Sequence, residues 1–290
     1  MKTLRVLLYA VLLFTALAPA NAQFAVSVAI KRRLFILHEP VLATVTLTNM
    51  TGRDVTLADT AEFQWFGFQI TGANETNIPP RNAHYSVEPI QLRPGETVKR
   101  TVNLNELYQL GEFGLLRVRA AIHFADTGKY HVSKPEIIEM TEGTKRWQQT
   151  VGVPGSTETR MFTLLSHQQE VKRMLYIRCE DPESGIVYCT FPVGGMIEGI
   201  SPQAAFDAVN CLYVLQLTGQ RAYVLTKVGL NGQFMGQTHY AAPKTRPTLR
   251  KLADGKLQII GGVKQDPVVA SAAPTEPPLR LSDRPPGLPK

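Results

Sequence analysis

The sequence has few of the features that would assign it a chemistry. Its three cysteines are too few for the disulfide-dense scaffold of a small secreted domain. It contains no Gly-x-Ser-x-Gly nucleophile elbow, no His-Glu-x-x-His zinc motif and no glycine-rich phosphate loop. After the first 22 residues, no apolar run approaches the ~20 residues that a transmembrane helix needs. We therefore assign no catalytic residue, no cofactor and no membrane span to the mature chain.

The N-terminal segment has the three-part layout of a secretory signal peptide at residues 1–22. Lys2 and Arg5 form a basic start, an apolar run follows, and a small-x-small cleavage site ends at Ala22. We expect cleavage before Gln23, which predicts a secreted protein that is periplasmic or extracellular.

The net charge is +7, and Lys2 and Arg5 contribute two of these charges. The later basic residues are scattered in short pairs, such as Lys99 and Arg100, rather than massed in one run. In an exported protein, such a charge favours anionic glycans or envelope lipids over nucleic acid. We therefore expect an unidentified protein or glycan partner at the envelope or outside the cell, and no nucleic acid.

Alternating apolar and polar residues dominate residues 23–143. Residues 41–48 and 116–124 alternate, and residues 63–70 form an aromatic-rich segment between them. Turn residues separate such segments at intervals of about 8–12 residues, a spacing typical of a β-sandwich. A further strand is expected at 97–104, and no part of this region has the 3.6-residue period of a helix.

A proline-glycine turn followed by a tyrosine marks the middle of this region. Pro94 and Gly95 begin a strand, and Tyr108 then precedes the alternating segment that starts at Gly114. This pattern resembles the immunoglobulin-like β-sandwich found in bacterial surface proteins and in the pro-regions of some secreted proteases. The resemblance covers about residues 24–142 and implies a scaffold rather than an activity. It leaves two roles for Tyr108: a tyrosine corner, whose hydroxyl bonds nearby backbone, or a plain core residue.

The second half predicts another all-β domain. Two glycines, a proline and a serine mark residues 144–157 as a linker, and a β-meander domain follows at residues 158–264. A weak repeat with spacings of 37 and 45 residues resembles β-propeller blades. The region holds two to three such units and a closed propeller needs at least four, so we expect an open meander with one short helical turn at 201–208. Its strands are expected at 160–165, 174–179, 185–193, 211–217, 221–228, 234–240 and 256–261.

The C-terminal segment, residues 265–290, is rich in proline, with seven among its 26 residues. Such a segment cannot build a core, so we expect a disordered tail. This composition is compatible with a functional spacer and also with a C-terminal segment that has no function of its own.

Cys179 and Cys189 flank the turn of an expected hairpin. A three-residue loop ending at Gly185 would set the two cysteines opposite each other, within disulfide reach. A four-residue loop would instead set Tyr188 opposite Cys179. Export permits oxidation, so the pair is a candidate disulfide, and we expect Cys211 to be buried outside it.

His123 and His131 are a weak candidate metal pair. A three-residue loop between their strands would set them side by side, at a spacing that could begin a zinc site. However, Arg117, Arg119 and Lys129 share their expected face and repel a cation, and no carboxylate or thiol has matching parity. We therefore expect a solvated histidine pair and no metal site.

Four tyrosines of the second half share one strand parity, which makes them either an exposed, ligand-facing stripe or a second core face. The stripe, with carboxylates from Asp181, Glu183, Glu198 or Asp207, would mark a carbohydrate-active enzyme or its accessory carbohydrate-binding protein. Turn and capping roles are the usual fate of such carboxylates. The tyrosines are Tyr176, Tyr188, Tyr213 and Tyr223.

The function we favour is an exported, non-catalytic binding or adhesion module of unknown ligand.

Overall fold

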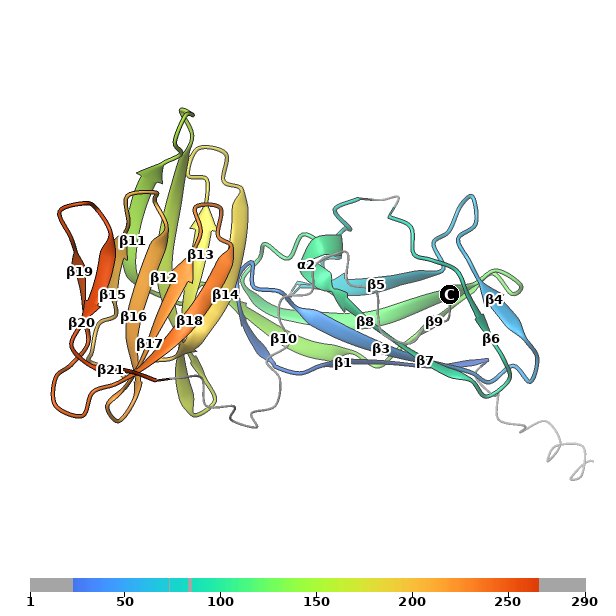
Figure 1. The fold of residues 1–290 in the computed structure, drawn as a ribbon. Helices are drawn as coiled ribbons and strands as arrows, with labels where there is room; N and C mark the ends of the chain where they lie inside the picture. Colours follow the sequence, from blue (N-terminus) through green and yellow to red (C-terminus); the bar gives the residue numbers. More distant parts are fainter. Residues whose placement is uncertain (1–22, 73, 83–84, 266–290) are drawn as a thin grey trace, which may run out of the picture. The chain divides into compact units, whose positions relative to one another are not determined.

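The computed structural model describes residues 23–265, except for residues 73, 83 and 84. The expected signal peptide and, apart from Gln265, the expected tail lie outside the described residues. The described chain is all-β, as the sequence predicts, with a single short helix among its strands (Figure 1). It divides into two compact units. Among the described residues, the first holds residues 23–144 and Cys189–Phe191, and the second holds Lys145–Tyr188 and residues 192–265.

Two sheets form the layers of the first unit, and their inner faces share one apolar core (Figure 1). The first sheet has the order β1 (Phe24–Ile30), β3 (Leu42–Asn49) and β7 (Thr97–Asn103). The second has the order β2 (Leu34–Ile36), β10 (Glu136–Thr141), β8 (Gly114–Phe124) and β5 (Phe66–Thr71), with β9 (Lys129–Val132) paired to β8. A separate pair joins β4 (Val55–Leu57) to β6 (Ile90–Leu92).

Strand β3 shows how the predicted alternation builds this core. Ala43, Val45 and Leu47 are buried, whereas the threonines between them point away from the core. On that outer face the hydroxyls of Thr44 and Thr101 lie 2.9 Å apart, which links β3 to β7. The predicted period-two strand is confirmed.

A one-turn helix, α2 (Leu104–Leu107), follows β7 directly. The side chain of Asn103 caps it by accepting a hydrogen bond from the amide of Asn105, at 3.3 Å. The strand expected at 97–104 therefore ends one residue early. A four-residue helix is too short to show a helical period, so the sequence pattern gives no sign of it.

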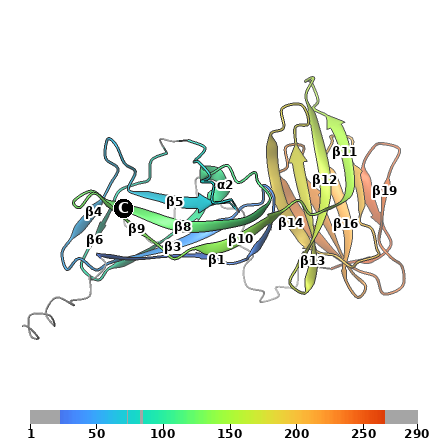
Figure 2. The same cartoon turned by 180° about the vertical axis from the view of Figure 1, so that it is seen from behind.

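Two larger sheets and a hairpin form the second unit (Figure 2). One sheet has the order β11 (Thr144–Gly152), β12 (Thr159–Gln169), β13 (Lys172–Glu180) and β14 (Val187–Gly195). The other has the order β15 (Gln203–Phe206), β16 (Leu212–Gly219), β17 (Ala222–Val228), β18 (Phe234–Ala241) and β21 (Val263–Gln265). The hairpin joins β19 (Thr248–Lys251) to β20 (Leu257–Ile260).

The linker prediction for residues 144–157 is wrong over most of its length. Residues 144–152 form β11, an edge strand, and a tight turn follows in which the amide of Val153 donates to the carbonyl of Glu158 at 2.9 Å. The glycine, proline and serine residues that suggested a linker thus form the turn between β11 and β12. Because β11 is mostly exposed, it lacks the apolar alternation that marks a strand in the sequence.

The helical turn expected at 201–208 is also wrong, because Gln203–Phe206 form β15. Backbone pairing with β16 sets Ala204 opposite Val214, and this pairing outweighs the local proline signal. Phe206 is buried and packs against Phe162 of β12, with ring centroids 5.2 Å apart. Packing between the two sheets of the second unit therefore decides the conformation of this segment.

The strands expected in the second unit are otherwise present with small shifts at their ends. Of the eight residues that strand parity places inside, five are buried and three are half-buried. The sheets are open in strand order, as expected for a meander. The buried five are Leu175, Ile177, Leu212, Val214 and Val224; the half-buried three are Val187, Cys189 and Ile259.

Candidate functional site

The structure separates the two histidines that the sequence offered as a metal pair. The loop between β8 and β9 has four residues rather than three, so His123 lies opposite Tyr130, one position out of register with His131. Neighbouring strand positions point to opposite faces, so the two imidazoles do not share a side of the sheet. His123 is buried beside Phe63, and His131 packs against Phe24, so the expected solvated pair is wrong. The described residues contain no group of three side chains suited to a metal ion.

The turn between β13 and β14 has four residues, because the amide of Asp181 donates to the carbonyl five residues later at 2.9 Å. Of the two loop lengths that the sequence left open, this one sets Tyr188 rather than Cys189 opposite Cys179. The structure holds all three cysteines as thiols, and Cys211 is half-buried rather than buried. The disulfide stays a prediction, and the observed turn disfavours it.

The four tyrosines do not form an exposed stripe. Tyr176 and Tyr223 are buried, which agrees with the alternative of a second core face. Tyr188 and Tyr213 reach the surface, but cations cover their rings: the guanidinium carbon of Arg160 lies 4.5 Å from the Tyr188 centroid, and a lysine nitrogen lies 5.0 Å from that of Tyr213. The four tyrosines therefore do not form a shared exposed surface on which a ligand could stack.

Three of the four candidate carboxylates of the second half have structural partners. Asp181 accepts a hydrogen bond from the amide of Glu183 at 2.9 Å, and Asp207 caps its own turn in the same way. Glu198 forms ion pairs with two arginines, the nearer being Arg173 at 2.9 Å. These contacts match the turn and capping roles that the sequence suggested for Asp181 and Asp207.

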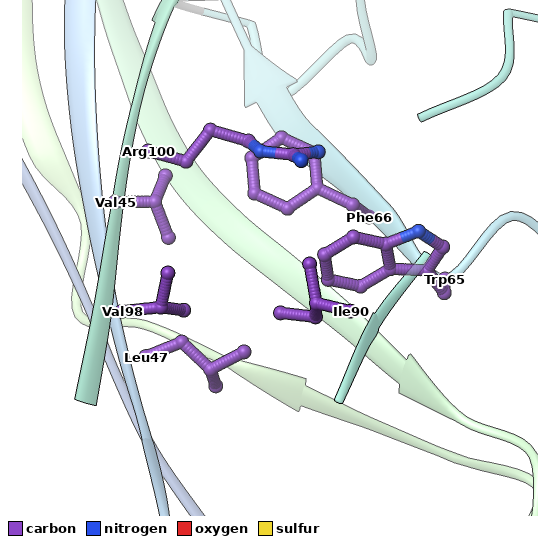
Figure 3. Close-up of a pocket in the computed structure, with 7 residues that line it drawn as sticks. All are labelled: Val45, Leu47, Trp65, Phe66, Ile90, Val98 and Arg100. Atoms are coloured by element: carbon purple, nitrogen blue, oxygen red, sulfur yellow. The ribbon is translucent and has the colours of Figure 1, made fainter. Parts of the chain in front are cut away.

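A small hollow opens into the core of the first unit, with side chains of β3 and β7 on one side and of β5 and β6 on the other (Figure 3). Its volume is about 20 Å³, which is room for about one water-sized group. The guanidinium carbon of Arg100 lies 5.5 Å from the ring centroid of Trp65 and 5.7 Å from that of Phe66. The hollow is lined by Val45, Leu47, Trp65, Phe66, Ile90, Val98 and Arg100.

Arg100 is an inward-facing cation on an edge strand. It lies opposite the buried Val45, and β7 ends its sheet. Burial lowers the pKa of the Arg100 guanidinium, and the negative charge of Glu88 opposes this shift. Inward charges on edge strands discourage pairing with a second chain, and the hollow is too small for a ligand. We therefore interpret Arg100 as a structural residue.

A much larger cavity lies in the second unit, where the turn between β16 and β17 meets the loop after β18. Its volume is about 220 Å³, more than ten times the 10–15 Å³ that one water requires. We call it the basic cleft, because three of its seven lining residues are cations and none is acidic. The lining residues are Leu217, Arg221, Tyr223, Ala242, Pro243, Lys244 and Arg246.

The lining of the basic cleft combines two buried residues with three exposed cations. Tyr223 and Ala242 belong to a buried cluster of the second unit. Arg221, Lys244 and Arg246 are exposed. Within the described ranges, none of these three cations forms an ion pair. The positive charge at the rim is therefore not neutralised by the described part of the chain.

Local backbone geometry brings Arg221 to the rim. It occupies a two-residue turn between Gly219 and Ala222, in the left-handed conformation with φ +59°. The carbonyl of Arg221 accepts a hydrogen bond from the amide of Ala242 at 2.8 Å. This bond ties the loop that carries the other two cations to the turn that carries Arg221.

Two glycines hold the same loop from its other side. Gly261 has φ +79°, and a Cβ there would lie 2.8 Å from the carbonyl oxygen of Arg246. A Cβ on Gly262 would lie 3.0 Å from Pro247, and its amide donates to Thr245 at 3.3 Å. Only glycines allow so close an approach of the two backbones. These close contacts of Gly261 and Gly262 fix the position of the loop that carries Lys244 and Arg246.

Sequence reasoning missed this site because its cations come from segments that are far apart. Two complete strands, β17 and β18, separate Arg221 from Lys244 in the sequence, and the two residues lie together because these strands form a hairpin. One local signal exists: Lys244 and Arg246 stand between Pro243 and Pro247, in a loop that cannot continue a strand. A search for adjacent basic residues in the sequence does not detect this arrangement, because Arg221, Lys244 and Arg246 are not adjacent to one another.

Comparison of the chain with protein-family models, with curated proteins and with solved structures gives no match. None of the helices in the described ranges has the length and apolar character needed to cross a membrane. The basic cleft is therefore assessed on its own geometry.

Proposed function

We propose that this chain is an exported, non-catalytic binding protein that holds an anionic ligand in the basic cleft. The observation that carries the proposal is the convergence of three cations, from two segments, on one cavity whose lining includes the buried Tyr223 and Ala242. Ligand sites are commonly concave, apolar surfaces with a few convergent polar groups. A bound anion would be attracted by all three charges.

The place of action follows from the first 22 residues, whose layout is that of a signal peptide. We infer that the mature chain begins at Gln23 and works in the periplasm or outside the cell. Its partner there is an anionic glycan, or a protein that presents an anionic group. The mildly basic net charge supports attraction of such partners over a distance.

A matched pair of polymers tests the proposal. Dextran sulfate and uncharged dextran share a backbone and differ in charge, so we expect only dextran sulfate to raise the melting temperature of the mature protein. A ligand at 100 times its Kd stabilises by about 2.7 kcal/mol. The triple variant Arg221→Gln, Lys244→Gln, Arg246→Gln should lose this response. Equal responses to both polymers, or an undiminished response in the triple variant, would contradict the proposal.

We infer further that the first unit is an immunoglobulin-like sandwich. The support is the pair of facing sheets, β1-β3-β7 and β2-β10-β8-β5, together with the buried Tyr108 that precedes β8. In such sandwiches the two sheets pack at about −30°. An experimental structure in which these sheets cross near 90° would overturn this assignment.

Carbohydrate binding at the first unit is a second candidate function, which one aromatic cluster favours. Phe63 and Tyr130 are exposed, and the ring centroid of the buried His123 lies 4.7 Å and 4.9 Å from theirs. Exposed rings of this kind offer apolar faces to a sugar. Glycan-array binding that is lost in Phe63→Ala and Tyr130→Ala, and kept in the triple variant of the basic cleft, would support this candidate over the first.

A further inference from the structure

We propose that the ligand of the basic cleft is a phosphate monoester carried on a small, ring-sized body. This inference rests on the proposed function, because it names the chemistry of the anion that the same cleft receives. It is based on the number of charges at the rim, the shapes of the cationic groups and the volume left beside them.

The charge at the rim suits a dianion. Arg221, Lys244 and Arg246 supply three positive charges around one cavity, and no lining residue is acidic. A carboxylate or a sulfate ester brings a single negative charge. A phosphate monoester brings about −1.5 to −2 at neutral pH, because its second pKa is near 6. It therefore neutralises more of the rim than the other two groups.

The shapes of the cationic groups also suit a phosphate. An arginine guanidinium is a planar fork that bonds two oxygens of one oxyanion, whereas a lysine ammonium acts as a point charge. A phosphate monoester presents three terminal oxygens. Two forks, from Arg221 and Arg246, and one point charge, from Lys244, can contact these oxygens together. The amide–carbonyl bond from Ala242 to Arg221, at 2.8 Å, keeps the two rim segments in fixed relation.

The volume requires more than the phosphate group itself. At about 220 Å³ the cavity has space for well over ten water-sized groups, whereas a phosphate group has five heavy atoms. Leu217, Tyr223, Ala242 and Pro243 line the cavity beside the three cations. A sugar ring, or a body of similar size and polarity, fits this space.

Isothermal titration calorimetry on the mature protein, at low ionic strength and pH 7.5, tests this proposal. Glucose 6-phosphate is the probe, and inorganic phosphate, glucose 6-sulfate and glucuronate are the comparators. We expect glucose 6-phosphate to bind most tightly, and its affinity to rise between pH 5 and pH 7 as the phosphate loses its second proton. The affinity for glucose 6-sulfate should not change over this range. Phosphatidic acid vesicles present the same group on a lipid.

Single variants locate the binding. Arg221→Gln, Lys244→Gln and Arg246→Gln should each weaken glucose 6-phosphate binding by about tenfold or more, since each removes a charge-assisted contact. Lys251→Gln removes an exposed cation of β19 that does not line the cleft, and it should leave the affinity unchanged. Circular dichroism of each variant checks that the fold is kept.

Four outcomes would overturn the inference. They are equal binding of glucuronate or glucose 6-sulfate, binding that the three variants leave unchanged, binding to phosphatidic acid vesicles alone, and no binding of glucose 6-phosphate. If dextran sulfate still binds through the same three cations in any of these cases, the proposed function stands and only the phosphate assignment fails. If neither dextran sulfate nor any phosphate binds, both fail.

Discussion

The hydroxyl of Tyr108 bonds both backbone groups of Phe68. It accepts from the amide at 2.8 Å and donates to the carbonyl at 2.9 Å. Phe68 lies in β5, the edge strand of its sheet, and these two groups point away from β8. Two residues earlier, the hydroxyl of Tyr85 donates to the carbonyl of Phe66 at 3.1 Å. Tyrosine hydroxyls thus complete the hydrogen bonding of an edge that would otherwise be open to another strand.

Tyr108→Phe should lower the free energy of unfolding of the protein by about 1–3 kcal/mol. The variant keeps the ring in the core but leaves the amide and carbonyl of Phe68 without their partner. Urea denaturation measures the change. Tyr130→Phe, which alters an exposed tyrosine, is the control and should have little effect. Equal effects of the two substitutions would contradict a structural role for the Tyr108 hydroxyl.

Gly67→Ala tests how closely the tyrosines approach β5. A Cβ at this position would lie 2.7 Å from the hydroxyl oxygen of Tyr85, so the tyrosine must move and the unfolding free energy should fall by about 1–3 kcal/mol. Gly111→Ala is the matched control, because a Cβ there meets no atom within 4 Å. A destabilisation of the same size in both variants would show that the contact with Tyr85 has no part in it.

Glu39 predicts a pH dependence of stability. It is buried, its carboxylate lies 2.5 Å from Arg32, and burial raises its pKa despite that partner. Since the folded state then binds the proton more tightly than the unfolded state, Glu39 contributes stability at low pH that is lost as the pH rises above about 4.5. The stability of the native protein relative to Glu39→Gln should therefore fall between pH 4 and pH 7 in urea titrations. If the stability of the native protein relative to Glu39→Gln instead rises with pH, the prediction is contradicted.

Gly261→Ala should weaken binding of anions to the basic cleft. The new Cβ would lie 2.8 Å from the carbonyl oxygen of Arg246, which pushes the cation-bearing loop away. Gly199→Ala is the matched control, because its φ of +81° carries the same backbone penalty of about 1–2 kcal/mol while no atom lies within 4 Å. Thermal shift with dextran sulfate should separate the two variants. Equal loss of the response in both would rule out the loop displacement.

The sequence alone determined the all-β class and most of the individual strands. Period-two patterns in residues 41–48 and 116–124 are local properties of a half-buried strand, and the structure confirms them as β3 and β8. A turn signal is also a local property: Gly185 ends the turn between β13 and β14 in the left-handed conformation that glycine favours, with φ +71°.

Only the tertiary structure decided the exposed edge strand, the register of the histidine hairpin and the basic cleft, because sequence patterns carry no information on contacts between distant residues. The edge strand β11 is mostly exposed, so no apolar alternation marks it in the sequence, and the linker prediction is wrong there. One extra residue in a turn reverses the face of every residue beyond it, which separated His123 from His131. The basic cleft depends on a hairpin, a backbone hydrogen bond and a glycine contact that join positions 221, 244, 246 and 261. Such long-range contacts follow from how the strands pair and pack, and not from the residues nearby in sequence.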